Sequence, residues 1–345
     1  MYHSYLTIFV PAVISFFITV LSTYFVINYF SSAGIVGKDY YKGKKRIIPS
    51  SGGVALSFGL IVGIMVYTFG GTFVYTPILK ISDLLAASLS IMLITFVGFI
   101  DDLNVKSKPQ KTTGMKDIRV GLKRWQKPLL TVIGAIPLMA INAGNSYVHI
   151  PLIGLVNLSY FYPLLVLPLA IIFVPNAVNL LGGFDGLQPG TTLVASLGFL
   201  IYCFIYGSNI SLLLSAILFA SILGFIWFNW YPSRIMPGDS FTYAVGATMV
   251  AIMVLGNLEF FGIIVFIPWI IEFLLHARKR FDVTDLGIRR SDGTLEPPYG
   301  KKIYSLTHVV MNMKRAREWE VSIYLSAFEA IFVVLAFILK ALALI

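Results

Sequence analysis

Long apolar runs recur along almost the whole chain, and each is close to the length that crosses a lipid bilayer. A transmembrane helix needs about 20 predominantly apolar residues. The composition agrees, because 57% of the 345 residues are apolar and only 12% are charged, whereas about a quarter of a soluble domain is charged. These features exclude a soluble globular protein, a disordered chain and an ordinary nucleic-acid binder. The runs predicted to span are 4–30, 53–75, 83–100, 128–143, 160–181, 190–206, 210–230, 241–256, 259–275 and 321–343.

The predicted fold is an all-α polytopic membrane protein with about ten transmembrane helices in a single domain, residues 1–345. The first run has no basic segment before it and is too long for a signal peptide, so we interpret it as the first span. A count of eight or nine transmembrane spans stays open, because only a few residues, 207–209 and 256–258, separate two pairs of neighbouring runs. The single cysteine, Cys203, excludes a disulfide framework and a cysteine-based metal site.

The basic residues lie almost entirely on one side of the predicted membrane. The chain has 26 Lys and Arg, and only Lys80 and Lys340 fall outside one set of alternate connections. Basic residues favour cytoplasmic loops. Both termini are therefore predicted to be exterior. The predicted cytoplasmic loops are 31–52, 101–127, 182–189, 231–240 and the long basic loop 276–320.

Acidic and amide side chains are concentrated at the predicted cytoplasmic boundary. Asp101 and Asp102 end the third span, and the i, i+3 spacing of Asn176 and Asn179 puts both on one helix face. Each motif also has an ordinary explanation, since acids cap helices or serve turns and amides hydrogen-bond between helices. Their shared side is what favours a functional site. The residues are Asp101, Asp102, Asn176, Asn179, Asp185 and Asp239.

These residue types indicate a site for a divalent cation and phosphate. Mg²⁺ prefers oxygen ligands, usually takes one or two carboxylates and completes its shell with phosphate and water. Lys127 and the cluster of His276, Arg278 and Arg280 lie beside the same boundary. Such cations suit phosphate and pyrophosphate, although a basic loop is also a topology determinant. The combination indicates a lipid phosphate that meets a nucleotide-activated donor at the cytosolic face.

Five stretches between about residues 35 and 300 form a more specific pattern. They are Gly37-Lys38-Asp39 with Ile48-Pro49, Phe99-Ile100-Asp101-Asp102, Leu122-Lys123-Arg124-Trp125-Gln126-Lys127, Asn176-Ala177-Val178-Asn179-Leu180 with Asp185-Gly186-Leu187, and Asn229-Trp230-Tyr231-Pro232-Ser233-Arg234 running into Gly238-Asp239-Ser240-Phe241. In order and spacing they resemble the polyprenyl-phosphate N-acetylhexosamine-1-phosphate transferase family. The resemblance is greater to its eukaryotic and archaeal dolichyl-phosphate branch than to the bacterial phospho-MurNAc-pentapeptide translocases.

The sequence departs from that branch in three places and from the bacterial members in one. About 20 extra residues, rich in lysine, separate the acid pair from Lys127. Asp185 is similar to the bacterial members, since the eukaryotic position tends to be Asn. The bacterial run of adjacent histidines is absent, and the basic residues around His276 look like the eukaryotic His/Arg cluster instead. The longer eukaryotic insertion before the last span is also missing.

The resemblance implies transfer of GlcNAc-1-phosphate from UDP-GlcNAc to a polyprenyl or dolichyl phosphate, with release of UMP, as the first membrane step of a glycan pathway such as N-glycosylation. It implies a multi-pass protein, in the cell membrane if prokaryotic, with the active site facing the cytoplasm, contact with membrane lipid, no nucleic acid, and a homodimer left open. The implied roles are Mg²⁺ or Mn²⁺ on Asp239 and Asn179, catalysis by Asp101, Asp102 and Lys127, and substrate binding by Asn176, Asp185, His276, Arg278 and Arg280.

Other classes of function agree less well with the sequence. A secondary transporter would carry ionisable residues at mid-membrane and paired broken helices in two repeats, yet only Glu272 and Glu329 lie within predicted spans. A CDP-alcohol phosphotransferase needs several aspartates at helical spacing on one segment, and a scaffold needs no acids gathered on one face. Within the family, another UDP-N-acetylhexosamine donor remains the alternative.

Overall fold

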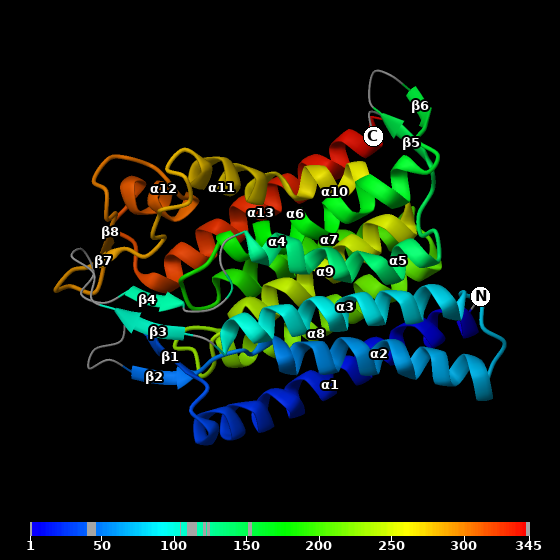
Figure 1. The fold of residues 1–345 in the computed structure, drawn as a ribbon, viewed down its shortest axis with the longest axis horizontal. Helices are drawn as coiled ribbons and strands as arrows, with labels where there is room; N and C mark the ends of the chain where they lie inside the picture. The colour runs from blue at the N-terminus through cyan, green and yellow to red at the C-terminus, as the bar shows by residue number, and fades with distance from the viewer. Residues whose placement is uncertain are drawn as a thin grey trace.

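Helices that run along one common axis make up nearly all of the structure (Figure 1). The computed structural model describes residues 2–39, 46–103, 105–108, 116–119, 122, 125–150 and 154–342. The predicted site residues all lie within these ranges. Lys123, Arg124 and much of the lysine-rich insertion before Lys127 lie outside the described residues.

Eight helices in the described ranges are long and apolar enough to cross a membrane, which confirms the all-α membrane fold. Their side chains are mostly aliphatic and aromatic, and hydroxyls within them bond to carbonyls one turn earlier, as Thr95 Oγ1 does to Ile91. The helices are α1 (Tyr2–Ala33), α2 (Gly53–Phe73), α3 (Ile81–Asp102), α6 (Leu167–Leu180) with the π-helical turn η2 (Tyr162–Val166) before it, α7 (Leu187–Ile205), α8 (Asn209–Asn229), α9 (Gly238–Gly256) and α13 (Glu318–Ala341).

The other two predicted spans are interrupted, so the described residues hold eight long spanning helices, or nine if the bent pair α10 and α11 is one span, within the range that the sequence left open. Run 259–275 forms α10 (Glu259–Val265) and α11 (Ile267–Ala277), bent by 58° just before Pro268. Run 128–143 forms the shorter series α4 (Gln126–Thr131), η1 (Val132–Ala135) and α5 (Ile136–Ala140) beside α3. Pro137 lacks the backbone N–H that an uninterrupted helix would use there.

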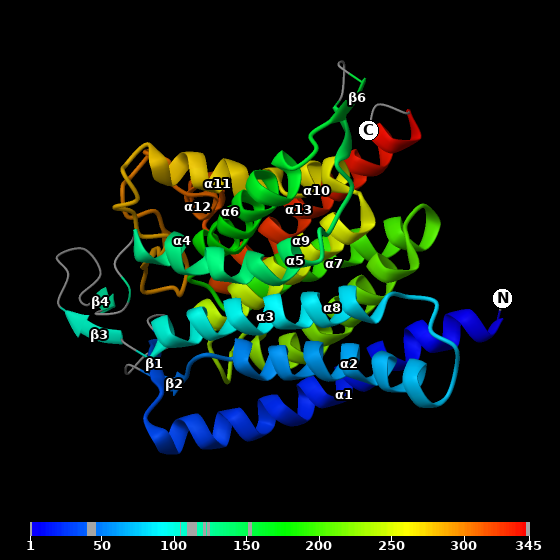
Figure 2. The ribbon, with the colours of Figure 1, turned by 45° about the vertical axis from the view of Figure 1, so that its right-hand side comes forward.

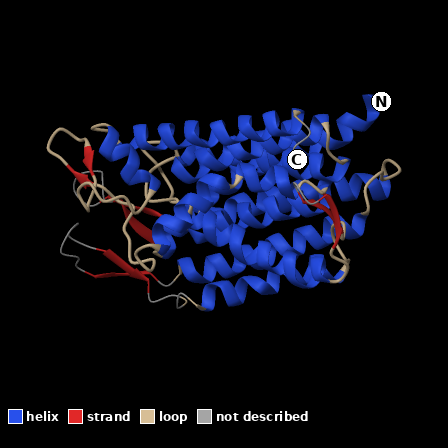
Figure 3. Cartoon of the chain, turned by 90° about the horizontal axis from the view of Figure 1, so that it is seen from above, coloured by secondary structure: helices blue, strands red, loops and turns tan. Residues whose placement is uncertain are grey.

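The two ends of the bundle differ in what they carry. Both chain termini lie at one end, together with the hairpin of β5 (Tyr147–Ile150) and β6 (Gly154–Asn157), so the chain crosses the bundle an even number of times (Figures 1 and 2). Figure 3 shows the remaining strands gathered at the opposite end. They form three antiparallel hairpins: β1 (Val36–Asp39) with β2 (Arg46–Pro49), β3 (Val105–Lys108) with β4 (Lys116–Arg119), and β7 (Ile288–Arg289) with β8 (Leu295–Glu296).

The central helix of the bundle is α9, which packs against α2, α3, α6 and α8. Its residues from Asp239 to Val254 are all buried. The backbone of α2 approaches its first turn so closely that a Cβ on Gly53 would lie 1.8 Å from the backbone nitrogen of Phe241. Such close packing of small residues is typical of membrane helices. It fixes the start of α9, where the candidate site begins.

Candidate active site

Three charged side chains from three helices meet at the end of the bundle away from the termini. Asp101 lies at the end of α3, Lys127 in α4 and Asp239 in the first turn of α9. The Nζ atom of Lys127 is 2.5 Å from Asp101 Oδ2 and 2.8 Å from Asp239 Oδ2. Both aspartates are 0% exposed, and the lysine side chain is 18% exposed. The structure thus places one ammonium group between two buried carboxylates. Asp101 precedes Lys127 by 26 residues and Asp239 follows it by 112 residues.

Asp102 has a different environment from its neighbour Asp101. Its Oδ1 accepts a hydrogen bond from the backbone nitrogen of Asp239 at 2.7 Å, and its Oδ2 accepts from the backbone nitrogen and the hydroxyl of Ser240 at 3.1 and 2.8 Å. The first N–H groups of a helix have no partner within the helix, and a negative charge there is favourable. Asp102 therefore holds the start of α9 and positions Asp239.

Gly238 makes this contact sterically feasible. Its φ of +74° is a left-handed conformation that glycine adopts without strain. A Cβ at this position would lie 2.3 Å from Asp102 Oδ2. The Gly238-Asp239-Ser240 motif is therefore explained locally: the glycine lets the Asp102 carboxylate reach the helix end, and the two residues after it supply the donors.

A cavity of about 340 Å³ extends from Asp239 between the ends of α6, α9 and α13. Predicted site residues Asn179 and Asp185 line it beside Asp239. Two further acids, Asp285 and Glu318, lie in its wall, although their positions in the sequence did not indicate this. The described structure therefore brings Lys127, three of the predicted acids and one predicted amide to one place.

Asp185 is held by the segment that follows α8. Its Oδ2 accepts a hydrogen bond from the backbone nitrogen of Ser233 at 2.8 Å, and its Oδ1 accepts from the Ser233 hydroxyl at 2.6 Å. Its own backbone nitrogen donates to Glu318 Oε1 at 3.0 Å, and Asn229 Oδ1 accepts from Gly186. The Asn-Trp-Tyr-Pro-Ser-Arg run thus positions the turn around Asp185, a role that spacing alone did not indicate.

Asn176 lies one turn deeper and contacts another helix. Its Oδ1 accepts a hydrogen bond from the Tyr243 hydroxyl at 2.8 Å, and its Nδ2 donates to the carbonyl of Ile172 at 2.7 Å. The first of these bonds connects α6 to α9. Amide side chains in membrane helices often form hydrogen bonds between helices. Asn176 does so here, and it therefore stabilises the bundle beneath Asn179.

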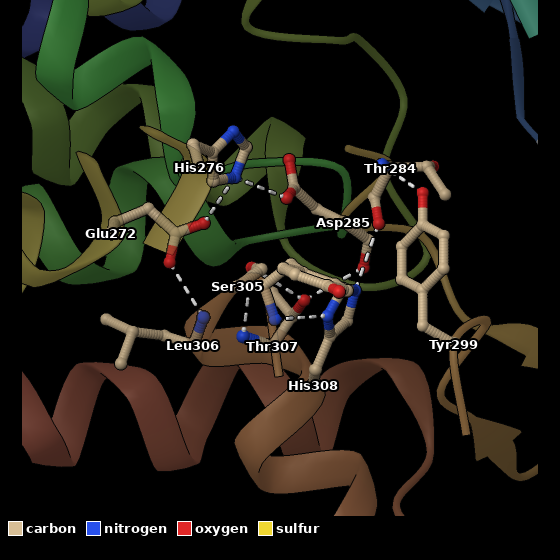
Figure 4. Close-up of polar contacts among 10 residues, drawn as sticks. Glu272, His276, Thr284, Asp285, Tyr299, Ser305, Leu306, Thr307 and His308 are labelled. Carbon is tan, nitrogen blue, oxygen red and sulfur yellow. Dashed lines mark hydrogen bonds and ion pairs between the residues drawn. The ribbon is translucent and has the colours of Figure 1, made fainter. Parts of the chain in front are cut away.

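His276 lies at the end of α11 in a network that Figure 4 shows. Its Nε2 is 2.9 Å from Glu272 Oε1 and 2.9 Å from Asp285 Oδ1. The sequence indicates only that Glu272 is an acid within a predicted span. It does not reveal that residues 285 and 306 fold back onto it. The network joins α11 to the loop that forms one wall of the cavity.

The basic residues after His276 are held by the loop itself. Arg278 Nη1 donates to the carbonyl of Ile303 at 3.4 Å, and its guanidinium lies 5.8 Å from the centre of the Tyr304 ring. Lys279 Nζ lies 3.8 Å above the Tyr299 ring, a favourable cation–π distance. Arg280 adopts a φ of 52° in the turn that ends the helix. Phosphate binding by Arg278 and Arg280 therefore stays a prediction.

His308 gives the loop a pH dependence. It lies in α12 (Leu306–Met313), where its Nε2 faces the carbonyl of Thr284 at 3.0 Å and its Nδ1 accepts from the backbone nitrogen of Tyr304 at 3.2 Å (Figure 4). Both bonds use the neutral ring, and burial lowers the pKa of His308. Nearby Asp285 opposes this shift, whereas His276 and Lys279 add to it.

We expect acidification to loosen this loop. Below the ordinary histidine pKa of about 6.5 the opened loop takes up a proton that the folded His308 does not, so stability present at neutral pH falls as the pH drops through that value. The protection of residues 284–308 against hydrogen exchange, after division by the intrinsic exchange rate at each pH, should therefore fall between pH 7.5 and 5.5. His308→Gln keeps a donor for Thr284 but does not titrate, so an equal pH effect in this variant contradicts the assignment.

Together the fold and the site define a polytopic membrane protein with buried acids, a lysine and a cavity at one end of its bundle. The sequence model of glycosyl transferase family 4 matches residues 84–257, and the chain belongs to this family.

Named relatives in the family are similar over much of the chain. The chain is 33% identical to a Saccharolobus solfataricus protein over 97% of both chains, and 30% identical to a Schizosaccharomyces pombe protein over 58% of this chain and 46% of the other. Both are named for UDP-N-acetylglucosamine–dolichyl-phosphate N-acetylglucosaminephosphotransferase activity. A Dictyoglomus turgidum phospho-N-acetylmuramoyl-pentapeptide-transferase is 28% identical over 72% of this chain and 74% of its own.

Proposed function

We propose that this membrane protein transfers N-acetylglucosamine 1-phosphate from UDP-N-acetylglucosamine to a polyprenyl phosphate of the dolichyl type and releases UMP. Similarity to the Saccharolobus solfataricus relative over 97% of both chains supports this activity. The structural observation that carries it is the Lys127 ammonium between Asp101 and Asp239, at the edge of the cavity. Lys127 supplies a cation, and the acids beside it could hold a divalent ion, which together suit a phosphate substrate.

The charge of the cavity explains how the donor would be accommodated. Its wall carries one lysine and five acids, Lys38, Asp39, Asp185, Asp239, Asp285 and Glu318. A pyrophosphate is repelled by such a wall unless a cation lies between them. Asp239 and Asn179 both line the cavity with oxygen ligands of the kind Mg²⁺ or Mn²⁺ prefers. These residues fit a divalent ion, which when bound would neutralise charge on the pyrophosphate.

The chain's own residues supply positioning more than driving force. One pyrophosphate linkage replaces another, so the free energy change of the reaction is small, and alignment and charge neutralisation determine the rate. Lys127 is held by two carboxylates and can share its three N–H donors with a phosphate. The acceptor phosphate is already an anion, so Asp101 serves to organise Lys127 and the phosphate or to accept a proton. Asp185 would contact the nucleotide end.

The direct test of this activity is transfer of radiolabel by the purified protein. UDP-[³H]GlcNAc with dolichyl phosphate should give a labelled lipid and release UMP, and undecaprenyl phosphate tests how far the lipid can vary. UDP-GalNAc tests the alternative that another UDP-N-acetylhexosamine is the donor. Labelled lipid from UDP-GalNAc but none from UDP-GlcNAc would overturn the donor assignment, and none from either would overturn the reaction.

We also propose that the end of the bundle that carries the site faces the cytoplasm, where UDP-sugars are made. Ser291, between β7 and β8, and Ser146, before β5, lie near opposite ends of the molecule (Figure 1). In a Cys203→Ala background, Ser146→Cys should react with an impermeant thiol reagent on intact cells. Ser291→Cys should react only after the cells are broken. Labelling of Ser291→Cys on intact cells contradicts the orientation.

A further inference from the structure

A second group of ligating side chains lies at the end of α11, distinct from the pair Asp239 and Asn179. Glu272 Oε1 and Asp285 Oδ1 each lie 2.9 Å from the same atom, Nε2 of His276 (Figure 4). The three ligand atoms all lie within 4.8 Å of one another. We propose that Glu272, His276 and Asp285 bind one divalent transition-metal cation of the Zn²⁺ class. This goes beyond the proposed transfer reaction and does not rest on it.

Counting protons and charges favours a cation here. One imidazole nitrogen carries either one hydrogen or one lone pair, so it cannot satisfy two carboxylates by hydrogen bonding. Even with a charged imidazolium, two ionised carboxylates leave the cluster with a net negative charge, so without a metal one of the two carboxyl groups must hold a proton. Glu272 is 0% exposed and His276 is 5% exposed, and uncompensated charge in such a place is costly. A divalent cation on a neutral imidazole brings the cluster to neutrality.

The distances suit metal coordination. Zinc–ligand bonds of about 2.1 Å at the tetrahedral angle separate their ligand atoms by about 3.4 Å, so the two observed separations of 2.9 Å need to widen by only about 0.5 Å to admit the ion. Glu272 and His276 are four residues apart in α11, so they project from one face of the helix. Asp285 reaches them from the loop after the helix. A helix and a loop thus supply three ligands and leave further positions for water.

Neighbouring groups orient these ligands. The backbone nitrogen of Leu306 donates to Glu272 Oε2 at 2.7 Å, and the Thr307 hydroxyl donates to the carbonyl of Asp285 at 2.9 Å (Figure 4). Metal-binding carboxylates and the groups beside them are held by such outer contacts. The start of α12 therefore holds two of the three ligands in place.

The donor set also separates this site from the magnesium site. Imidazole suits Zn²⁺ and similar transition metals, whereas Mg²⁺ favours oxygen ligands alone. Asp285 also lines the cavity. A cation on Asp285 would therefore fix one wall of the cavity by tying it to α11, while the transfer chemistry takes place at Asp239.

Metal binding by the purified full-length protein tests the proposal. The protein is made without a histidine tag, treated with chelator and then incubated with Zn²⁺ in excess Mg²⁺, which occupies oxygen-only sites. Wild-type protein should retain one equivalent of zinc, and its X-ray absorption should show one nitrogen ligand, from a single imidazole, together with oxygen ligands. Retention of no zinc overturns the proposal and shows that a proton, not a metal, joins these residues.

Variants assign the bound metal to these residues. His276→Gln and Asp285→Asn should weaken zinc binding by about a hundredfold or more, since even outer contacts of a metal site are worth about 10- to 100-fold. The matched control is Asp282→Asn, an exposed acid in the same loop, and Asp239→Asn should also keep its zinc. Wild-type affinity in both ligand variants overturns the assignment, and the wild-type stoichiometry and spectrum decide the matter even if these variants do not fold.

Discussion

Asp239→Asn protein is expected to lose its transfer activity by about a hundredfold or more, while it folds as stably as the wild type. Removal of one charge-stabilising group from a reaction centre costs about 10² to 10³ in kcat. Asparagine keeps the size of the side chain and the start of α9, but it removes the charge that faces Lys127 and the proposed Mg²⁺. The ion pair of Lys127 with Asp101 at 2.5 Å is left in place, so the loss should be one of chemistry.

A metal titration separates this loss from a general defect. The transfer rate is measured against Mg²⁺ concentration for the variant, the wild type and Asp292→Asn, which makes the same chemical change at an exposed turn. The control should follow the wild-type curve, and Asp239→Asn should need more Mg²⁺ and reach a far lower rate. An Asp239→Asn protein with the wild-type rate and wild-type Mg²⁺ dependence shows that the metal lies elsewhere.

The sequence was a good guide to helices wherever an apolar run was long and free of interruption. It was a poorer guide to where an apolar run breaks. The run 128–143 contains Pro137 and forms three short helical pieces, and the run 259–275 contains Pro268 and bends by 58°. Hydropathy measures how apolar a segment is and does not report such breaks. A missing backbone N–H favours a break but does not decide it alone, because α1 continues through Pro11 and α6 through Pro175. The same composition therefore gives a straight span in one place and a broken one in another.

Sequence spacing also predicted which residues gather at one end but not what each one contacts. Asp101 and Asp102 are adjacent and chemically identical, yet one pairs with Lys127 and the other binds the start of α9. The difference arises because successive helical residues point about 100° apart. Glu272 and Asp285 were not predicted for a related reason, since their partner His276 unites them only after the loop folds back.

Asp102→Asn is expected to lower both stability and activity, unlike Asp239→Asn. An amide can accept hydrogen bonds on one side only, so its NH₂ group must face a donor, either the backbone N–H of Asp239 or the donors of Ser240. A buried donor left without an acceptor costs about 1–3 kcal/mol. The loss of negative charge at the helix start adds to this cost. Because α9 then shifts at its first turn, Asp239 is displaced and the transfer rate falls as well.

Thermal unfolding and transfer rates, measured on the same preparations, decide whether Asp102 positions α9 or acts on substrate. A positioning residue predicts that Asp102→Asn lowers Tm, whereas Asp239→Asn does not. Ser240→Ala is the matched control, because it removes only one of the three donors to Asp102 and should cost about 1 kcal/mol. An Asp102→Asn protein with wild-type Tm and no activity would instead mean that this carboxylate contacts the substrate or its metal, because a bond that merely holds a helix start cannot be lost without lowering stability.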